Sequence, residues 1–145
     1  DYDCAYCDKM EAVFSQVLAK YPQDLKLVIK QYPIRSHPNA RQASIAAVAA
    51  HQQGKFWEFH SQIFANQTEL STTKLDEIAE SFDLDMTQFK KDLLSSDVLS
   101  MIVRDIREGQ KIGVRGTPTL FLNGKRVKDR TFKNLDKLIQ RELVK

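Results

Sequence analysis

Two cysteines separated by two residues, Cys4 and Cys7, are the residues best suited to chemistry, and they are the only cysteines in the chain. They stand at the head of a helical pattern, and one helical turn brings both sulfurs onto one face, where they can close a small disulfide ring. A helix N-terminus has unpaired N–H groups and a partial positive charge, which favour a thiolate over a thiol. Because the thiolate is the reactive form of cysteine, the pair indicates a redox centre.

Three other roles for the pair stay open at this point: small buried apolar residues, a static disulfide, or half of a zinc site. A disulfide across two residues restrains the unfolded chain little, because the entropic contribution grows with loop length. Zinc in structural sites takes four ligands, and the chain has no second cysteine pair. Its three histidines, His37, His51 and His60, are scattered and have no zinc-finger spacing. The rest of the chain has to decide, since such a pair indicates redox chemistry when a βαβ pattern accompanies it.

Length and composition indicate one soluble globular unit of 145 residues, with 42% hydrophobic and 28% charged residues. The formal net charge is only +3 and the basic residues are interspersed with acidic ones, so nucleic-acid binding has little support. The longest apolar stretch, residues 45–50, is far too short to cross a bilayer. We therefore expect neither a nucleic-acid partner nor stable membrane insertion.

Apolar periodicity predicts that helices dominate the chain. Polar residues suited to N-caps stand before three of the helices: Ser71 to Lys74, Asp85, and Ser96 or Asp97. Asn123-Gly124 is a strong hairpin turn. The order predicts a small central sheet with helices on its faces and a helical insertion. The predicted helices cover about 7–20, 40–53, 55–66, 71–82, 85–94, 96–111 and 131–143, and the predicted strands cover 25–32, 119–122 and 125–128.

Only three residues precede Cys4, whereas a βαβ unit needs a strand in front of its helix. We therefore expect the first strand to be absent from this chain, with a parent protein that is longer or incompletely represented.

Four motifs together resemble the DsbA-like thiol:disulfide oxidoreductases of the thioredoxin superfamily. They are the runs Asp-Tyr-Asp-Cys-Ala-Tyr-Cys at 1–7, His-Pro-Asn-Ala at 37–40, Gly-Lys-Phe-Trp at 54–57 and Gly-Val-Arg-Gly-Thr-Pro-Thr at 113–119. The resemblance extends over essentially the whole chain. A CxxC pair alone is only moderately specific, but a distant Gly-Thr-Pro-Thr leading into a strand and hairpin makes the signal strong.

The resemblance implies an α/β chain with a thioredoxin-like fold and an inserted helical domain. The thioredoxin-like domain would comprise residues 1–36 and 108–145, and the inserted helical domain residues 37–107. The first strand of that fold is expected to be missing from this chain.

By the same resemblance, Cys4 is the exposed nucleophile and Cys7 the more buried resolving cysteine. Pro118 matches the family's cis-proline beside the disulfide, so that the Thr117 backbone can pair with an extended substrate peptide. Ala5 and Tyr6, between the cysteines, are expected to contact substrate and to influence the thiolate. The expected cofactor is none beyond the redox-active disulfide Cys4–Cys7, and no metal is expected.

The implied activity is exchange of the CxxC disulfide with the thiols of substrate proteins, most simply as a DsbA-like oxidase in the periplasm or another extracytoplasmic space. The implied partners are cysteine-containing proteins and a redox partner that reoxidises or reduces the pair. Many relatives have proline or histidine where this chain has Ala5 and Tyr6, so the direction of the reaction stays open. The alternatives are a disulfide reductase or isomerase, and a non-catalytic peptide-binding or chaperone-like module.

Two further residues have ordinary interpretations. His37 precedes a proline in a loop and is predicted to be a cap or surface group, and Arg115 beside the Gly-Thr-Pro loop is predicted to be a solvated charge. A positive potential from Arg115 near Cys4 is the alternative.

Overall fold

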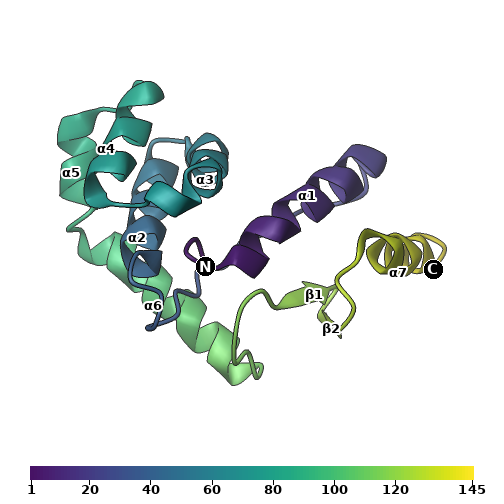
Figure 1. The fold of residues 1–145 in the computed structure, drawn as a ribbon. Helices are drawn as coiled ribbons and strands as arrows, with labels where there is room; N and C mark the ends of the chain where they lie inside the picture. The colour runs from purple at the N-terminus through teal and green to yellow at the C-terminus, as the bar shows by residue number, and fades with distance from the viewer.

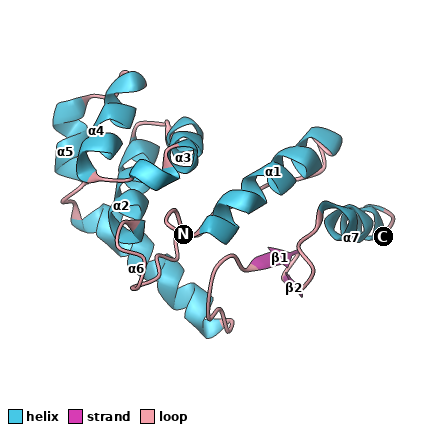
Figure 2. Ribbon diagram, in the orientation of Figure 1, coloured by secondary structure: helices cyan, strands magenta, loops and turns pink.

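The computed structural model describes residues 1–145 as seven α-helices, one short 3-10 helix and one two-stranded sheet (Figures 1 and 2). In chain order the elements are α1 (Ala5–Lys20), α2 (Ala40–Gln52), α3 (Phe56–Ala65), η1 (Gln67–Glu69), α4 (Thr72–Ser81), α5 (Met86–Asp92), α6 (Ser96–Lys111), β1 (Leu120–Leu122), β2 (Lys125–Val127) and α7 (Phe132–Leu143). All seven predicted helices are present, and η1 is an element that the sequence pattern did not predict.

Side-chain caps fix the starts of several helices. Ser71 accepts a hydrogen bond from the N–H of Lys74 at the start of α4, and Asp85 accepts one from Gln88 at the start of α5. At α6 the N-cap is Ser95, whereas the sequence pattern predicted Ser96 or Asp97. Each cap satisfies an N–H group that has no partner inside its own helix.

The hairpin forms as predicted. β1 and β2 pair antiparallel, with Leu120 opposite Val127 and Leu122 opposite Lys125. Both turn residues, Asn123 and Gly124, have positive φ, at 46° and 77°. Positive φ at both central positions is the type I′ turn, whose twist matches that of the flanking strands.

The helices form two groups that meet at the N-terminus (Figure 1). Helices α2–α6 lie on one side, while α1, the hairpin and α7 lie on the other. Buried residues of the first group form a core that also includes Tyr2, Cys4 and Cys7. A second core joins α1 to the hairpin and α7 through Met10, Val17 and buried residues at 127, 135 and 139. The cysteine pair therefore lies where the two groups join; the domain boundaries at 36/37 and 107/108 remain a prediction.

The predicted strand at 25–32 is not formed as a hydrogen-bonded strand. The segment is extended and its burial alternates along 25–31, as in a strand with one covered face. Residues 25–30, however, make no backbone–backbone hydrogen bond. The prediction of a strand there was wrong in this respect because a ladder needs a neighbouring strand, and the one sheet of the structure contains only β1 and β2.

An apolar groove of about 480 Å³ lies between this extended segment, α1 and β1. Its lining includes Cys7, Glu11 and His60 together with apolar side chains such as Phe14 and Leu120. The backbone of 25–30 thus runs beside an apolar space without a strand partner.

Candidate active site

Helix α1 places the two cysteines one turn apart. Cys4 is the N-cap residue, with extended backbone (φ −107°, ψ 113°), and its carbonyl accepts the N–H of Cys7 at 2.9 Å. Both are free thiols and both are buried, with 5% of Cys4 and 8% of Cys7 exposed. The exposed areas of the two residues therefore do not distinguish an exposed Cys4 from a more buried Cys7, and both residues belong to the core cluster shared with the helical group.

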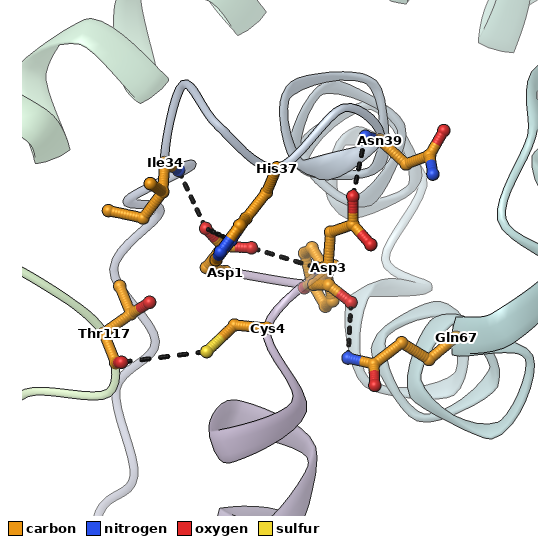
Figure 3. Close-up of polar contacts among 9 residues, drawn as sticks. Asp1, Asp3, Cys4, Ile34, His37, Asn39, Gln67 and Thr117 are labelled. Carbon is orange, nitrogen blue, oxygen red and sulfur yellow. Dashed lines mark hydrogen bonds and ion pairs between the residues drawn. The ribbon is translucent and has the colours of Figure 1, made fainter.

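A loop 113 residues away completes the surroundings of Cys4. The Cys4 thiol donates a hydrogen bond to the carbonyl oxygen of Thr117 at 3.7 Å, and the Thr117–Pro118 peptide bond is cis. Within the loop, the Thr119 hydroxyl donates to the carbonyl of Gly116 at 2.7 Å. Figure 3 shows the Cys4 sulfur directed at Thr117, on the segment that leads into β1.

The surroundings of the two thiols act in opposite directions. Burial tends to raise the pKa of Cys4, but hydrogen bonds from the Thr117 side chain, from the Cys7 N–H and thiol and from the Tyr6 N–H outweigh it, and the pKa is lowered. Burial raises the pKa of Cys7 above its ordinary value. At neutral pH Cys4 is therefore the better thiolate and Cys7 the better thiol.

Two carboxylates in front of the cysteines anchor this turn (Figure 3). Asp1, whose side chain is fully buried, accepts the N–H of Ile34 at 2.7 Å and pairs with His37 Nδ1 at 2.8 Å. Asp3 accepts the N–H of Asn39 at 2.8 Å, just before α2 begins. The residues of 1–3 thereby tie the cysteine turn to the loop at 34–39.

The sequence interpretation missed Asp1 and Asp3, although two carboxylates two residues apart in front of a cysteine pair are a readable signal. His37 was predicted to be a cap or surface group; instead it pairs with the buried Asp1 carboxylate. Ala5 and Tyr6 both face solvent, and Tyr6 is 68% exposed. Exposure leaves the Tyr6 ring open to contact from another molecule.

A family model described as thioredoxin matches residues 1–141, which is nearly the whole chain and both halves of the site. The chain belongs to the thioredoxin family. The helices around a small sheet, the cysteine pair at a helix N-terminus and the cis-proline loop opposite it are thus parts of a thioredoxin-like fold with added helices.

Curated relatives of this thioredoxin-family chain are much longer proteins. It is 36% identical over 127 residues to the Na(+)/H(+) antiporter NhaA 3 of Salinispora tropica, covering 87% of this chain and 19% of that protein. It is 34% identical over 129 residues to the Na(+)/H(+) antiporter NhaA 1 of Mycolicibacterium gilvum, covering 87% of this chain and 21% of that protein. The chain spans about one fifth of the length of these relatives.

Solved structures give the same fold. A thioredoxin-like oxidoreductase from Silicibacter pomeroyi DSS-3 superposes with a TM-score of 0.84 at 27% identity, covering 100% of this chain and 83% of that one. The thiol-disulfide exchange protein alpha-DsbA2 from Wolbachia pipientis has a TM-score of 0.86 at 20% identity, covering 98% of this chain and 77% of that one. These findings confirm the resemblance to the thioredoxin superfamily and the thioredoxin-like fold.

None of the seven helices combines the length and the hydrophobicity that crossing a bilayer requires.

Proposed function

We propose that Cys4 is the sulfur of a thiol:disulfide exchange centre that reacts with substrate and leaves as a thiolate, that Cys7 is the resolving cysteine that closes the disulfide with it, and that the chain acts as an oxidase of protein thiols. The observation that carries this proposal is the geometry of the pair: two free thiols lie one turn apart at the N-terminus of α1, and the Cys4 thiol lies 3.7 Å from the Thr117 carbonyl oxygen, beside the cis peptide bond to Pro118. The lowered pKa of Cys4 and the raised pKa of Cys7 agree with this geometry. An exchange centre needs one sulfur that leaves easily as a thiolate and a second that holds its proton.

The oxidised pair is a Cys4–Cys7 disulfide. A substrate thiolate attacks the Cys4 sulfur, forms a mixed disulfide with Cys4 and displaces Cys7 as a thiolate, which takes a proton. A second substrate thiolate then attacks the substrate sulfur of that mixed disulfide and releases the Cys4 thiolate. The substrate gains one disulfide and loses two electrons, and the cysteine pair gains the same two electrons.

The direction follows from the Cys4 thiolate. Whatever stabilises this thiolate stabilises the reduced pair relative to the disulfide, so the disulfide becomes more oxidising. The hydrogen bonds that lower the Cys4 pKa favour that direction.

Substrate contact is proposed at the surface around the pair. The exposed Tyr6 ring and Ala5 flank the disulfide, and the backbone of Thr117 before Pro118 would pair with an extended peptide. The partners would be cysteine-containing proteins and a redox protein that restores the disulfide. Such an oxidase requires a compartment in which thiols are not held reduced, and we propose the periplasm or another extracytoplasmic space.

The deciding experiment is equilibration of the pair with glutathione buffers of graded composition, followed by mass spectrometry of trapped thiols. An oxidase is expected to have a reduction potential near roughly −120 mV, and a reductase a potential near roughly −270 mV. A value near the second would overturn the oxidase assignment while keeping exchange chemistry. Failure of Cys4 and Cys7 to form a disulfide at any composition would overturn exchange altogether and leave a peptide-binding module.

A further inference from the structure

The imidazole of His60 bonds to both flanks of the cysteine pair. Its Nδ1 lies 2.9 Å from the hydroxyl of Tyr2, and its Nε2 lies 3.1 Å from a carboxylate oxygen of Glu11. Tyr2 precedes Cys4 by two residues, and Glu11 follows Cys7 by four. His60 itself comes from α3, in the other group of helices, and is 3% exposed.

The two partners of His60 determine which ring nitrogen donates a hydrogen bond and which accepts one. A carboxylate oxygen accepts, so His60 Nε2 carries a hydrogen toward Glu11; in the imidazole tautomer that this bond selects, Nδ1 accepts from the Tyr2 hydroxyl. Burial raises the pKa of Tyr2 well above its ordinary value, which keeps the hydroxyl a donor. Both ring nitrogens are therefore satisfied in one tautomer, and a fully satisfied buried polar network rigidifies its surroundings.

Aromatic side chains hold the imidazole in place. Its ring centroid lies 5.2–5.5 Å from those of Tyr2, Phe56, Trp57 and Phe64. Such packing leaves the ring little freedom to turn away from its two partners.

The position of His60 matters because stabilisation of the Cys4 thiolate depends on the first turn of α1. The N–H groups of Tyr6 and Cys7 and the side chain of Thr117 act on the sulfur only if that turn and the 117–118 loop stay aligned. Glu11 lies one turn along α1 from Cys7, and both line the groove together with Tyr2 and His60.

We propose that His60 is a positioning residue for the cysteine pair, and that its bonds to Tyr2 and Glu11 hold the start of α1 in the geometry that stabilises the Cys4 thiolate. The proposal deepens the exchange function and rests on the role given there to Cys4.

The test measures thiolate formation by absorbance at 240 nm against pH, together with the equilibrium constant against glutathione. His60→Phe keeps an aromatic ring and removes both bonds, and Glu11→Met removes one bond at a half-buried position. Each is expected to move the ionisation midpoint of Cys4 upward by about half a pH unit or more, and the equilibrium about three- to tenfold toward the disulfide. Glu11→Gln keeps an acceptor for Nε2–H and is expected to shift both readouts less than half as far as Glu11→Met.

The matched control is Ile63→Ala, a fully buried residue of the same helix with no polar role. It lowers stability, but we expect it to leave the ionisation midpoint in place. Shifts in His60→Phe and Glu11→Met no larger than in this control would overturn the positioning role. If His60→Phe does not fold, the comparison of Glu11→Met with Glu11→Gln decides. An ordinary ionisation midpoint in the unmodified chain would instead count against the proposed function itself.

Discussion

At the residue scale, Cys4 and Cys7 share one helical turn and nearly equal burial, yet they differ in acidity. What distinguishes them is the balance between burial, which raises the pKa of a thiol, and the hydrogen bonds that the thiolate would receive, which lower it. Cys4 has N–H donors and the side chain of Thr117 near its sulfur, whereas burial dominates at Cys7. This difference predicts distinct consequences for the loss of each sulfur.

Replacing Cys4 with Ser is expected to abolish exchange with a disulfide peptide, because the attacking sulfur is gone. Replacing Cys7 with Ser is expected to leave attack intact and to trap a mixed disulfide between Cys4 and the peptide, because no second sulfur resolves it. Mass spectrometry of acid-quenched mixtures checks both. A stable adduct on Cys7 in the Cys4→Ser variant would reverse the assignment of the two roles.

The lowered Cys4 pKa also makes the stability of the reduced chain depend on pH. Its folded-state pKa lies below the unfolded value, so its stabilising contribution is present above the unfolded pKa and is lost as pH falls through the folded pKa. The stability advantage of the reduced chain over a reduced Cys4→Ser variant is therefore expected to grow as the pH rises toward the unfolded cysteine pKa of about 8.5 and to level off above it. Urea unfolding of both chains across these pH values measures it; an advantage that is constant with pH would contradict the lowered pKa.

At the element scale, α6 holds the extended segment that precedes the Asp1-binding loop. Asp105 on α6 is nearly buried and accepts the backbone N–H of Gln31 at 2.9 Å and the Lys30 ammonium at 3.1 Å. Next to it, Gly109 lets the Tyr32 ring approach, since a Cβ there would lie 3.0 Å from a ring carbon. The Asp105 carboxylate thus accepts a backbone hydrogen bond that a neighbouring strand would accept in a sheet.

Asp105→Ala is expected to lower the free energy of unfolding by about 1–3 kcal/mol, because it leaves the buried N–H of Gln31 without a partner. Asp105→Asn keeps an acceptor and is expected to lower it less. Glu108→Ala provides the control: this exposed residue binds the same lysine, and its loss is expected to change stability by less than about 0.5 kcal/mol. Equal effects of the alanine substitutions in urea unfolding would show that burial of the Asp105 bond is unimportant.

At the scale of the whole molecule, the cysteine pair lies where two helical groups meet, with the groove between α1, β1 and the 25–32 segment beside it. Backbone N–H groups without partners exchange readily with solvent, whereas those in packed helices exchange only after opening. The amides of 27–30 are therefore expected to exchange at least about a hundredfold faster than those of 46–50 in α2. Residue-resolved deuterium exchange measures this ratio. Equal protection would mean that a strand partner occupies the edge in solution.

The sequence by itself determined the helices, the hairpin and the cysteine pair. Their signals are local: apolar spacing along a helix, a capping hydroxyl such as Ser71, two turn residues at Asn123 and Gly124, and two cysteines one turn apart. A helix closes its own hydrogen bonds within a few residues, so a local pattern is sufficient to predict it.

Spacing along the chain does not reveal which distant residues act on the pair: the family resemblance implied Thr117 and Pro118, and the remaining contacts are visible only in the folded chain. Thr117 meets Cys4 across 113 residues, His37 meets Asp1 across 36, and His60 meets Tyr2 across 58. None of these contacts leaves a period or a spacing in the sequence. The same reason explains the error at 25–32: its composition suits a strand, but a strand is defined by hydrogen bonds to another segment, and that neighbour is a property of the fold rather than of the segment.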